Sequence, residues 1–322
     1  MWGSNGIELI DPNQGYIGDC WIVAAASCVA QTPERIRKLF VTDDLNNAGV
    51  YTVTLYLMGI PVTVTVDDYL PFWAGSNNLT YASASSDGAL WMPILEKAAA
   101  KLYGNYEMLV GGWMGPAIQT LTGSPFFDVY HSEMSVDELW DWINVKIQED
   151  WMVTAGSPFG DGSDKTQNSI GVAYMHAYTM LGTETLSNGQ RLVRMRNPWG
   201  VEKFKGPYAD WRKNEWGEFL GESDKWTDAL KAELEYVSAD DGMWYITMED
   251  YHWSFSDTTA NPNIDDWHSS HYAAFEVATP ELHTENITIS SDVDQMVYIS
   301  AYTYDSQHIR NGLCYDEDAI KN

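Results

Sequence analysis

A cysteine at the start of an apolar run is the first residue of this chain that is placed for chemistry. Cys20 opens the run Cys20–Ala30, which we expect to form a helix that is buried on all sides. Asp19 suits the position just outside a helix N-terminus, so Cys20 would lie in the first turn, where the helix dipole lowers a thiol pKa. Gln14 can reach back toward the sulfur with an N–H donor. These are the parts of an activated thiolate with half an oxyanion hole.

Two residues far downstream favour catalysis over simple packing for this cysteine. A thiol nucleophile needs a base that takes its proton and later returns it, and His176 suits that task near neutral pH. The imidazole must be held by a third group, and Asn197 follows 21 positions later. The order Cys, His, Asn, with the last two far downstream, is the papain-like arrangement.

Three separated signatures resemble the protease core of the calpains: QGYIGDCW at 14–21, HAY at 176–178 and RNPWG at 196–200. Three further stretches agree with the resemblance, at 66–71, 95–98 and 106–112. The resemblance covers roughly residues 6–256. It implies an α+β fold, a papain-like, two-lobed cysteine protease core with a helical lobe and a β lobe, followed by the start of a β-sandwich.

The resemblance also implies a role for each residue of the signatures. Cys20 would attack a peptide carbonyl, His176 would act as base and then as acid, and Asn197 would orient the imidazole. Gln14 and the Cys20 backbone N–H would stabilise the oxyanion. Trp199 would shield the hydrogen bond between His176 and Asn197 from water, although a role as an ordinary core aromatic stays open.

Two positions bear on how a substrate would fit. Gly112, at the expected edge of the cleft, would let the substrate backbone approach closely, and the alternative is that it only ends a helix. Calpains carry a glycine before the catalytic histidine, but this chain has Met175 there. We expect this departure to narrow or reshape the cleft, and it leaves the substrate preference open.

Calcium is the cofactor that the resemblance implies. Calpain cores carry two calcium loops, whose occupation brings the two halves together and aligns the triad, and calcium prefers six to eight oxygen ligands. In the first loop Asp11 and Gly6 match ligand positions. Ala89 stands where a glutamate is expected, with Asp87 close by.

The second calcium loop is also incomplete. Asp210 and Asp241 match ligand positions, whereas Lys203 and Met243 stand at the other two acidic positions. Glu202 and Asp240 are next to these two in sequence. Either the loop still binds calcium or the Lys203 ammonium replaces the cation.

Composition limits the function classes. The 322 residues hold 18 Lys+Arg and 46 Asp+Glu, a formal net charge of -28, which repels nucleic acid and anionic membrane. The excess of acidic residues has two explanations. One is solubility or adaptation of the proteome to acid or salt, and the other is cation binding. The chain has three cysteines, Cys20, Cys28 and Cys314. This low, odd number argues against a disulfide framework and favours a reducing, cytoplasmic location. No apolar run is long enough for a membrane span.

The chain divides into three expected units. Their ranges are 1–124 for a mostly helical lobe with the nucleophile, 125–258 for a mostly β lobe with His176 and Asn197, and 262–322 for a partial C2-like β-sandwich. Helices are predicted over 20–40, 91–109 and 135–149, a hairpin over 50–70, and strands around His176 and over 191–196. About sixty residues are fewer than the roughly one hundred of a whole sandwich, so we expect the chain to end inside that unit.

The leading interpretation is a calpain-like, intracellular cysteine endopeptidase that performs limited proteolysis of protein substrates, with calcium activation as an open question and regulatory domains outside this chain. An alternative is a catalytically silent calpain-like scaffold, which the altered calcium positions and Met175 favour and the complete triad opposes. A third class, a transglutaminase-like acyltransferase, is disfavoured because its third catalytic residue is an aspartate, whereas Asn197 stands here.

Overall fold

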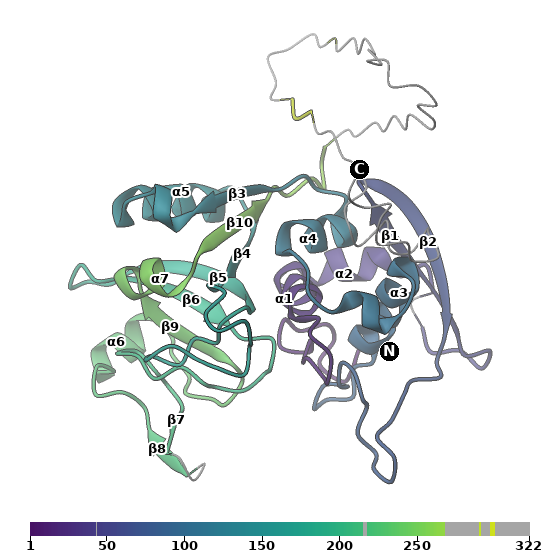
Figure 1. The fold of residues 1–322 in the computed structure, drawn as a ribbon, viewed down its shortest axis with the longest axis horizontal. Coiled ribbons are helices and arrows are strands. Elements are labelled where there is room, and N and C mark those ends of the chain that lie inside the picture. Colours follow the sequence, from purple (N-terminus) through teal and green to yellow (C-terminus); the bar gives the residue numbers. More distant parts are fainter. Residues whose placement is uncertain (43, 215–217, 268–289, 291–296, 300–322) are drawn as a thin grey trace.

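The computed structural model describes residues 1–42, 44–214, 218–267, 290 and 297–299. Its elements gather into two parts that lie side by side (Figure 1). The helical half, residues 1–122, contains α1 (Cys20–Val29), α2 (Pro33–Leu39), β1 (Val50–Leu57), β2 (Ile60–Asp67), α3 (Trp91–Tyr103), the 3₁₀ helix η1 (Tyr106–Leu109) and α4 (Met114–Thr122).

The sheet half, residues 127–261, is built on one antiparallel sheet of six strands in the order β3-β10-β4-β5-β6-β9. These strands are β3 (Phe127–Tyr130), β4 (Met152–Gly156), β5 (Ala177–Thr185), β6 (Arg191–Arg196), β9 (Met243–Thr247) and β10 (Asp257–Asn261). The remaining elements are η2 (His131–Glu133), α5 (Val136–Gln148), the β7 (Arg212–Lys213) and β8 (Phe219–Gly221) ribbon, α6 (Asp228–Glu233) and α7 (Met248–Ser254).

Helix α1 is buried along its whole length, as its continuous apolar sequence predicts. It packs against α4 in its own half and against β4 and β5 of the other half. Hydrogen bonds cross this contact, since Thr179 Oγ1 donates to Ala24 O at 2.7 Å and Gln31 Nε2 donates to Met180 O at 3.3 Å. The helix that carries Cys20 is therefore the central element of the interface between the two halves.

The sheet lies between two hydrophobic cores. Successive strand residues point to opposite faces, so Met152 joins the core of the helical half, whereas Val153 joins the core that α5 and α7 cover. Helix α5 begins with the capping box that its sequence predicts, because Ser135 and Glu138 bond each other's backbone N–H. The β4 and β5 strands thus present one face to α1 and the other to α5.

Several local predictions are confirmed and some boundaries are corrected. The predicted 20–40 segment forms two helices that restart at Pro33, and the hairpin pairs Val53 with Val64 in register. The single helix predicted over 91–109 is interrupted, because Gly104 has a φ of 117° and ends α3. His176 precedes β5 and is not part of a strand.

The expected three-unit division stays a prediction. The proposed β-sandwich over 262–322 lies almost wholly outside the described residues. Within the part of the chain that the structure describes, no helix is both long enough and apolar enough to cross a bilayer.

A buried arginine joins the two halves. Arg196, at the end of β6, is fully buried, and its Nη2 donates to the carbonyls of Ile10 and Pro12 at 3.0 and 2.8 Å. The same guanidinium donates to Asn13 Oδ1 at 3.1 Å and to Ser27 Oγ at 3.2 Å. Burial lowers the pKa of Arg196 to about 10, so the side chain stays charged at neutral pH.

We expect Arg196→Met to lower the free energy of unfolding by about 3–5 kcal/mol, because several buried oxygens of the helical half lose their donor. Urea unfolding measures the change. Arg194→Met is the matched control, since Arg194 lies on the same strand but is exposed. An equal, small effect of both substitutions would contradict the role given to Arg196.

Candidate active site

Cys20 is the first residue of α1, and its sulfur reaches the other half of the molecule. The thiol lies within hydrogen-bonding reach of the Ala177 backbone N–H, which belongs to the residue after His176. Only 9% of Cys20 is exposed. The predicted nucleophile and the predicted base are therefore brought together from residues 156 positions apart in sequence.

The hydrogen bonds around Asn197 show which nitrogen of the His176 imidazole donates to it. His176 Nε2 lies 2.9 Å from Asn197 Oδ1, and the Trp199 backbone N–H donates to the same atom at 3.0 Å. An atom that accepts from a backbone N–H is the amide oxygen, so Nε2 carries a proton and donates to it. Burial lowers the pKa of the ring, which favours its neutral form. Nδ1 is then an unprotonated base, and it is buried with no hydrogen-bond partner among the described residues.

Two aromatic rings enclose the imidazole. Trp199 lies with its ring centroid 4.4 Å from that of His176, which matches the shielding position expected for it. Tyr178, which the sequence analysis did not single out, contacts the ring edge-on at 4.9 Å. Both rings keep water away from the bond between His176 and Asn197, and a bond in such surroundings is electrostatically stronger than in water.

The backbone of His176 is held by a residue that sequence reasoning missed. Ser157 Oγ accepts from the His176 N–H at 2.9 Å, and the Ser157 N–H donates to the His176 carbonyl at 3.0 Å. Asn197 is held similarly, since its N–H donates to the Gly242 carbonyl at 2.8 Å. A serine 19 positions before the histidine carries no sequence signal, because only the β4–β5 pairing brings it there.

Gln14 lies at the junction of the two halves. Its backbone N–H donates to the Pro198 carbonyl at 2.8 Å, which ties it to the segment that holds Asn197. Its side-chain Nε2 donates to Ile17 O at 2.7 Å, while Oε1 is buried without a partner among the described residues. The contribution of this amide group to an oxyanion hole stays a prediction.

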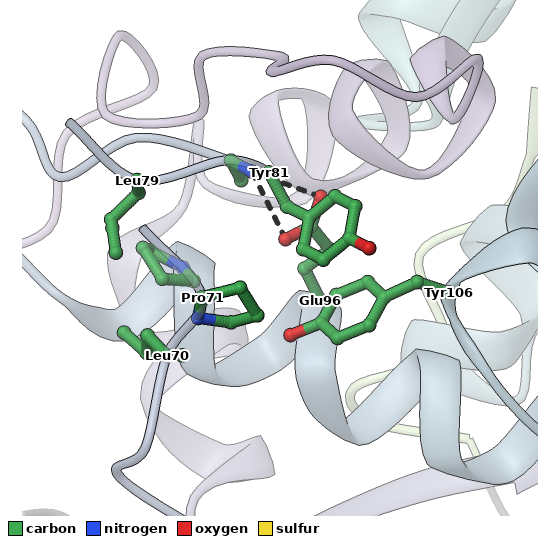
Figure 2. A pocket seen from close by; sticks show the side chains of 8 residues that line it. Leu70, Pro71, Leu79, Tyr81, Glu96 and Tyr106 are labelled. Carbon is green, nitrogen blue, oxygen red and sulfur yellow. Dashed lines mark hydrogen bonds between the residues drawn. The ribbon is translucent and has the colours of Figure 1, made fainter. Parts of the chain in front are cut away.

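Asp19 does not cap α1 as predicted. It precedes the helix, but its side chain makes no capping hydrogen bond and is instead buried beside Glu96. Both Glu96 oxygens accept from the Ala82 N–H at 3.0 Å, at the wall of a small pocket that Tyr81 and Tyr106 also line (Figure 2). Burial, and then the Asp19 charge, raise the pKa of Glu96 well above its ordinary value.

The sequence predicts that the helix dipole lowers the pKa of the Cys20 thiol. This prediction is wrong, because the pKa is raised. Burial raises the pKa of Cys20 to about 12, and the charges of Asp19 and Asp164 act in the same direction. Burial also lowers the pKa of His176 to about 4, against the opposing effect of its bond to Asn197. The thiol and the imidazole are therefore both neutral near pH 7, because burial disfavours the charged form of each group.

Gly112 belongs to the helical half and Met175 to the sheet half. A Cβ on Gly112 would stand 2.4 Å from the ring of Trp21, so close packing on α1 already requires a glycine there, whatever its role toward substrate. Met175 has a φ of 45°, a left-handed conformation that glycine adopts more readily. Its substrate contacts, like those of Gly112, stay predictions.

The first loop expected to hold calcium is organised around Asp11. Its Oδ2 accepts from the Glu8 N–H at 2.9 Å and from Trp91 Nε1 at 2.6 Å, while Oδ1 is buried with no partner among the described residues. Gly6 has a φ of 88° in the same loop. Burial is the main cause of a raised Asp11 pKa.

The second loop places Glu202, not Lys203, beside the matching acids. Lys203 is exposed, which disfavours its replacing a cation, whereas Glu202 is buried with Oε2 unpartnered among the described residues. Burial, and then the charge of Asp210, raise the pKa of Glu202, and Asp241 contributes to the same shift. Burial also raises the pKa of Asp210 to about 7. Among the described residues, no three His, Cys, Asp or Glu side chains are close enough together to hold a metal ion.

Comparison with known proteins identifies the family. The profile of the "calpain family cysteine protease" matches residues 2–260, and the chain belongs to this family. The helical half and the antiparallel sheet are thus the papain-like, α+β protease core that the sequence predicts. The expected β-sandwich is not part of this match.

Similar proteins come from plants and animals. The chain is 32% identical over 256 residues to the calpain-type cysteine protease ADL1 of Oryza sativa subsp. japonica, a match that covers 77% of this chain and 11% of that protein. It is 30% identical over 257 residues to calpain-13 of Rattus norvegicus, covering 78% of this chain and 37% of that protein. The chain therefore spans about a tenth of the plant relative and about a third of the animal one.

We expect alkylation of Cys20 by iodoacetamide to be slow near neutral pH and to rise by about tenfold per pH unit up to at least about pH 9, because the thiolate fraction does so below the thiol pKa. Mass spectrometry of the Cys20 peptide measures the rate, and Cys20→Ala is the blank. A rate that levels off above about pH 5 would show a thiolate–imidazolium pair and contradict the neutral resting state.

Proposed function

We propose that this chain is a cysteine endopeptidase in which Cys20, His176 and Asn197 are the catalytic triad. One observation carries the proposal: Asn197 Oδ1 holds His176 Nε2–H and leaves Nδ1 without a partner among the described residues, while the Cys20 thiol lies within reach of the backbone N–H of the next residue, Ala177. Membership of the calpain family supports the same chemistry.

The residues suggest a consistent course for peptide cleavage. His176 Nδ1 takes the proton of Cys20 Sγ as the sulfur attacks the peptide carbonyl, and Asn197 keeps the imidazolium in place. The Cys20 backbone N–H, with the Gln14 amide, stabilises the oxyanion. Nδ1–H then protonates the leaving amine, and a water that His176 activates hydrolyses the thioester.

Access requires the two halves to part locally. Only 9% of Cys20 and 3% of His176 are exposed, so a peptide cannot reach the sulfur in this conformation. Parting also hydrates both groups, which moves the thiol pKa down and the imidazole pKa up toward their ordinary values. We therefore propose that parting of the two halves has two effects. It admits the substrate, and it lets Cys20 become a thiolate and His176 an imidazolium. Extended segments of cytoplasmic proteins are the proposed substrates.

Calcium is proposed as the regulator, on the chemistry of the donor groups. Carboxylate and carbonyl oxygens are the ligands that calcium prefers. In the second loop Glu202, Asp210 and Asp241 are too far apart to form a metal site in this conformation, so they would have to move together to hold the ion. Two of them have buried oxygens without a partner among the described residues. In the first loop Asp11 and the Gly6 carbonyl would do so. A bound ion would supply positive charge to buried carboxylates and thereby stabilise the loops.

Purified protein should cleave casein, and Cys20→Ala should abolish cleavage. We expect His176→Ala to lower the rate at least about 100-fold and Gln14→Ala by about 100- to 1000-fold. Cys28→Ala is the matched control, since Cys28 is a second buried cysteine on the same helix and should retain activity. A folded wild-type protein without cleavage, with or without calcium, would instead support the silent scaffold.

We expect about 1 mM calcium to raise the thermal unfolding temperature by a few degrees relative to magnesium at the same concentration, because only the native state holds the loops together. Glu202→Gln with Asp210→Asn should remove most of this increase, while Lys203→Gln should leave it unchanged. Differential scanning fluorimetry measures the shift. If calcium leaves the wild-type temperature unchanged, the proposed calcium sites are wrong, whatever the catalytic result.

A further inference from the structure

The pairing of β4 with β5 continues past the ends of both strands as far as the proposed base. The last strand pair is Gly156 opposite Ala177, so Ser157 comes next to His176. The Ser157 N–H donates to the His176 carbonyl at 3.0 Å. Two residues paired in this way in an antiparallel ladder normally exchange two backbone bonds. Here the His176 N–H donates instead to the serine side chain, with 2.9 Å between N and Oγ.

The backbone before His176 accounts for this replacement. Met175 has a φ of 45°, which lies outside the extended range of a strand, so a regular ladder cannot continue on both sides of His176. The Met175 N–H reaches the Pro158 carbonyl at 2.8 Å. A buried N–H needs an acceptor, and His176 is buried. The hydroxyl of Ser157 therefore takes the place of a backbone carbonyl.

The same hydroxyl serves both peptide groups that flank the Cα atom of His176. It accepts from the N–H of one peptide and donates to the carbonyl of the other, at 3.1 Å. A hydroxyl has one hydrogen to donate and two lone pairs to accept with, so both bonds can form at once. Holding the two peptides restricts φ and ψ of His176 and therefore the direction of its Cα–Cβ bond. Alanine at position 157 would leave a buried N–H without this acceptor.

The side chain of His176 is thereby held at two ends. Asn197 Oδ1 accepts from Nε2 at 2.9 Å, which restrains the far end of the ring. The bonds of Ser157 restrain the other end, where the side chain leaves the backbone. The peptide that they hold also carries the Ala177 N–H, which lies within hydrogen-bonding reach of the Cys20 thiol. The position of Nδ1 therefore depends on the serine as well as on the asparagine.

We propose that Ser157 is a positioning residue for the cleavage reaction, because its hydroxyl sets where His176 presents Nδ1 without itself touching substrate. Displacement of a catalytic group by about 1 Å can slow a reaction about 100-fold. Loss of a group that acts on geometry and not on substrate binding lowers kcat and kcat/KM equally. This role rests on the proposed function, but the position of the imidazole can be measured without proteolysis.

The first test compares two buried serines. Ser157→Ala removes the hydroxyl beside His176. Ser124→Ala is the matched control, because the buried Ser124 hydroxyl donates to the Pro262 carbonyl at 2.7 Å, in the link between α4 and β3. We expect Ser157→Ala to lower kcat for dye-labelled casein about 10- to 100-fold, with KM changed less than about twofold. Ser124→Ala should keep the wild-type kcat, although both variants should unfold a few degrees earlier.

The second test observes the imidazole directly by NMR of protein made with isotope-labelled histidine. The Nε2–H that His176 donates to Asn197 should give a proton signal that exchanges slowly with water, because two aromatic rings enclose the imidazole. His176→Ala identifies the signal by its loss. We expect Ser157→Ala to shift the signal and to speed its exchange at least about tenfold, while Ser124→Ala leaves both unchanged.

The two tests separate this role from the proposed function. A lower kcat and an altered Nε2–H signal in Ser157→Ala alone would support the positioning role. If Ser157→Ala has no larger effect than Ser124→Ala on either measurement, Ser157 is only a structural residue and the positioning role is wrong. If the wild-type protein cleaves no casein but Ser157→Ala alone alters the signal, the hydroxyl does position His176, and it is the protease function that fails.

Discussion

The guanidinium of Arg196 is a buried charge of the sheet half, and among the described residues its hydrogen bonds all go to the helical half. The residue after it is Asn197, so the strand end that joins the halves also positions the group that orients the base. Around it the chain is closely fitted: a Cβ on Gly200 would lie 1.8 Å from Asn13 Oδ1, and Gln14 N–H bonds the Pro198 carbonyl. The geometry of the triad is therefore a consequence of how residues 10–14 and 196–200 pack together.

This close interface has an electrostatic consequence. Excluding water strengthens the bond from His176 to Asn197, but it also disfavours the thiolate and the imidazolium, and the shifts at Cys20 and His176 show that the second effect is larger. The interface that positions Cys20, His176 and Asn197 thus also keeps the first two uncharged. Under the proposed function, the active form has to keep the alignment that Arg196 provides while it lets water or substrate reach the sulfur.

Local signals in the sequence predicted the parts of the fold that depend on neighbouring residues. The apolar α1, the restart at Pro33 and the capping box at Ser135 all follow from patterns a few residues long. The triad residues were found because their motifs resemble a known family. Ser157 and the buried side chain of Asp19 were missed, because β4–β5 pairing and the contact with Glu96 join residues far apart in sequence. The side-chain direction that buries Glu202 and exposes Lys203 likewise depends on tertiary packing.

The loop that begins at Ser157 is attached directly to the proposed base. Ser157 binds both the N–H and the carbonyl of His176, while Met175 ends the loop one residue before the imidazole. A change in the position of this loop therefore moves the short backbone segment that sets the position of Nδ1. The left-handed backbone of Met175 lies in that segment, so its conformation and the position of His176 are linked.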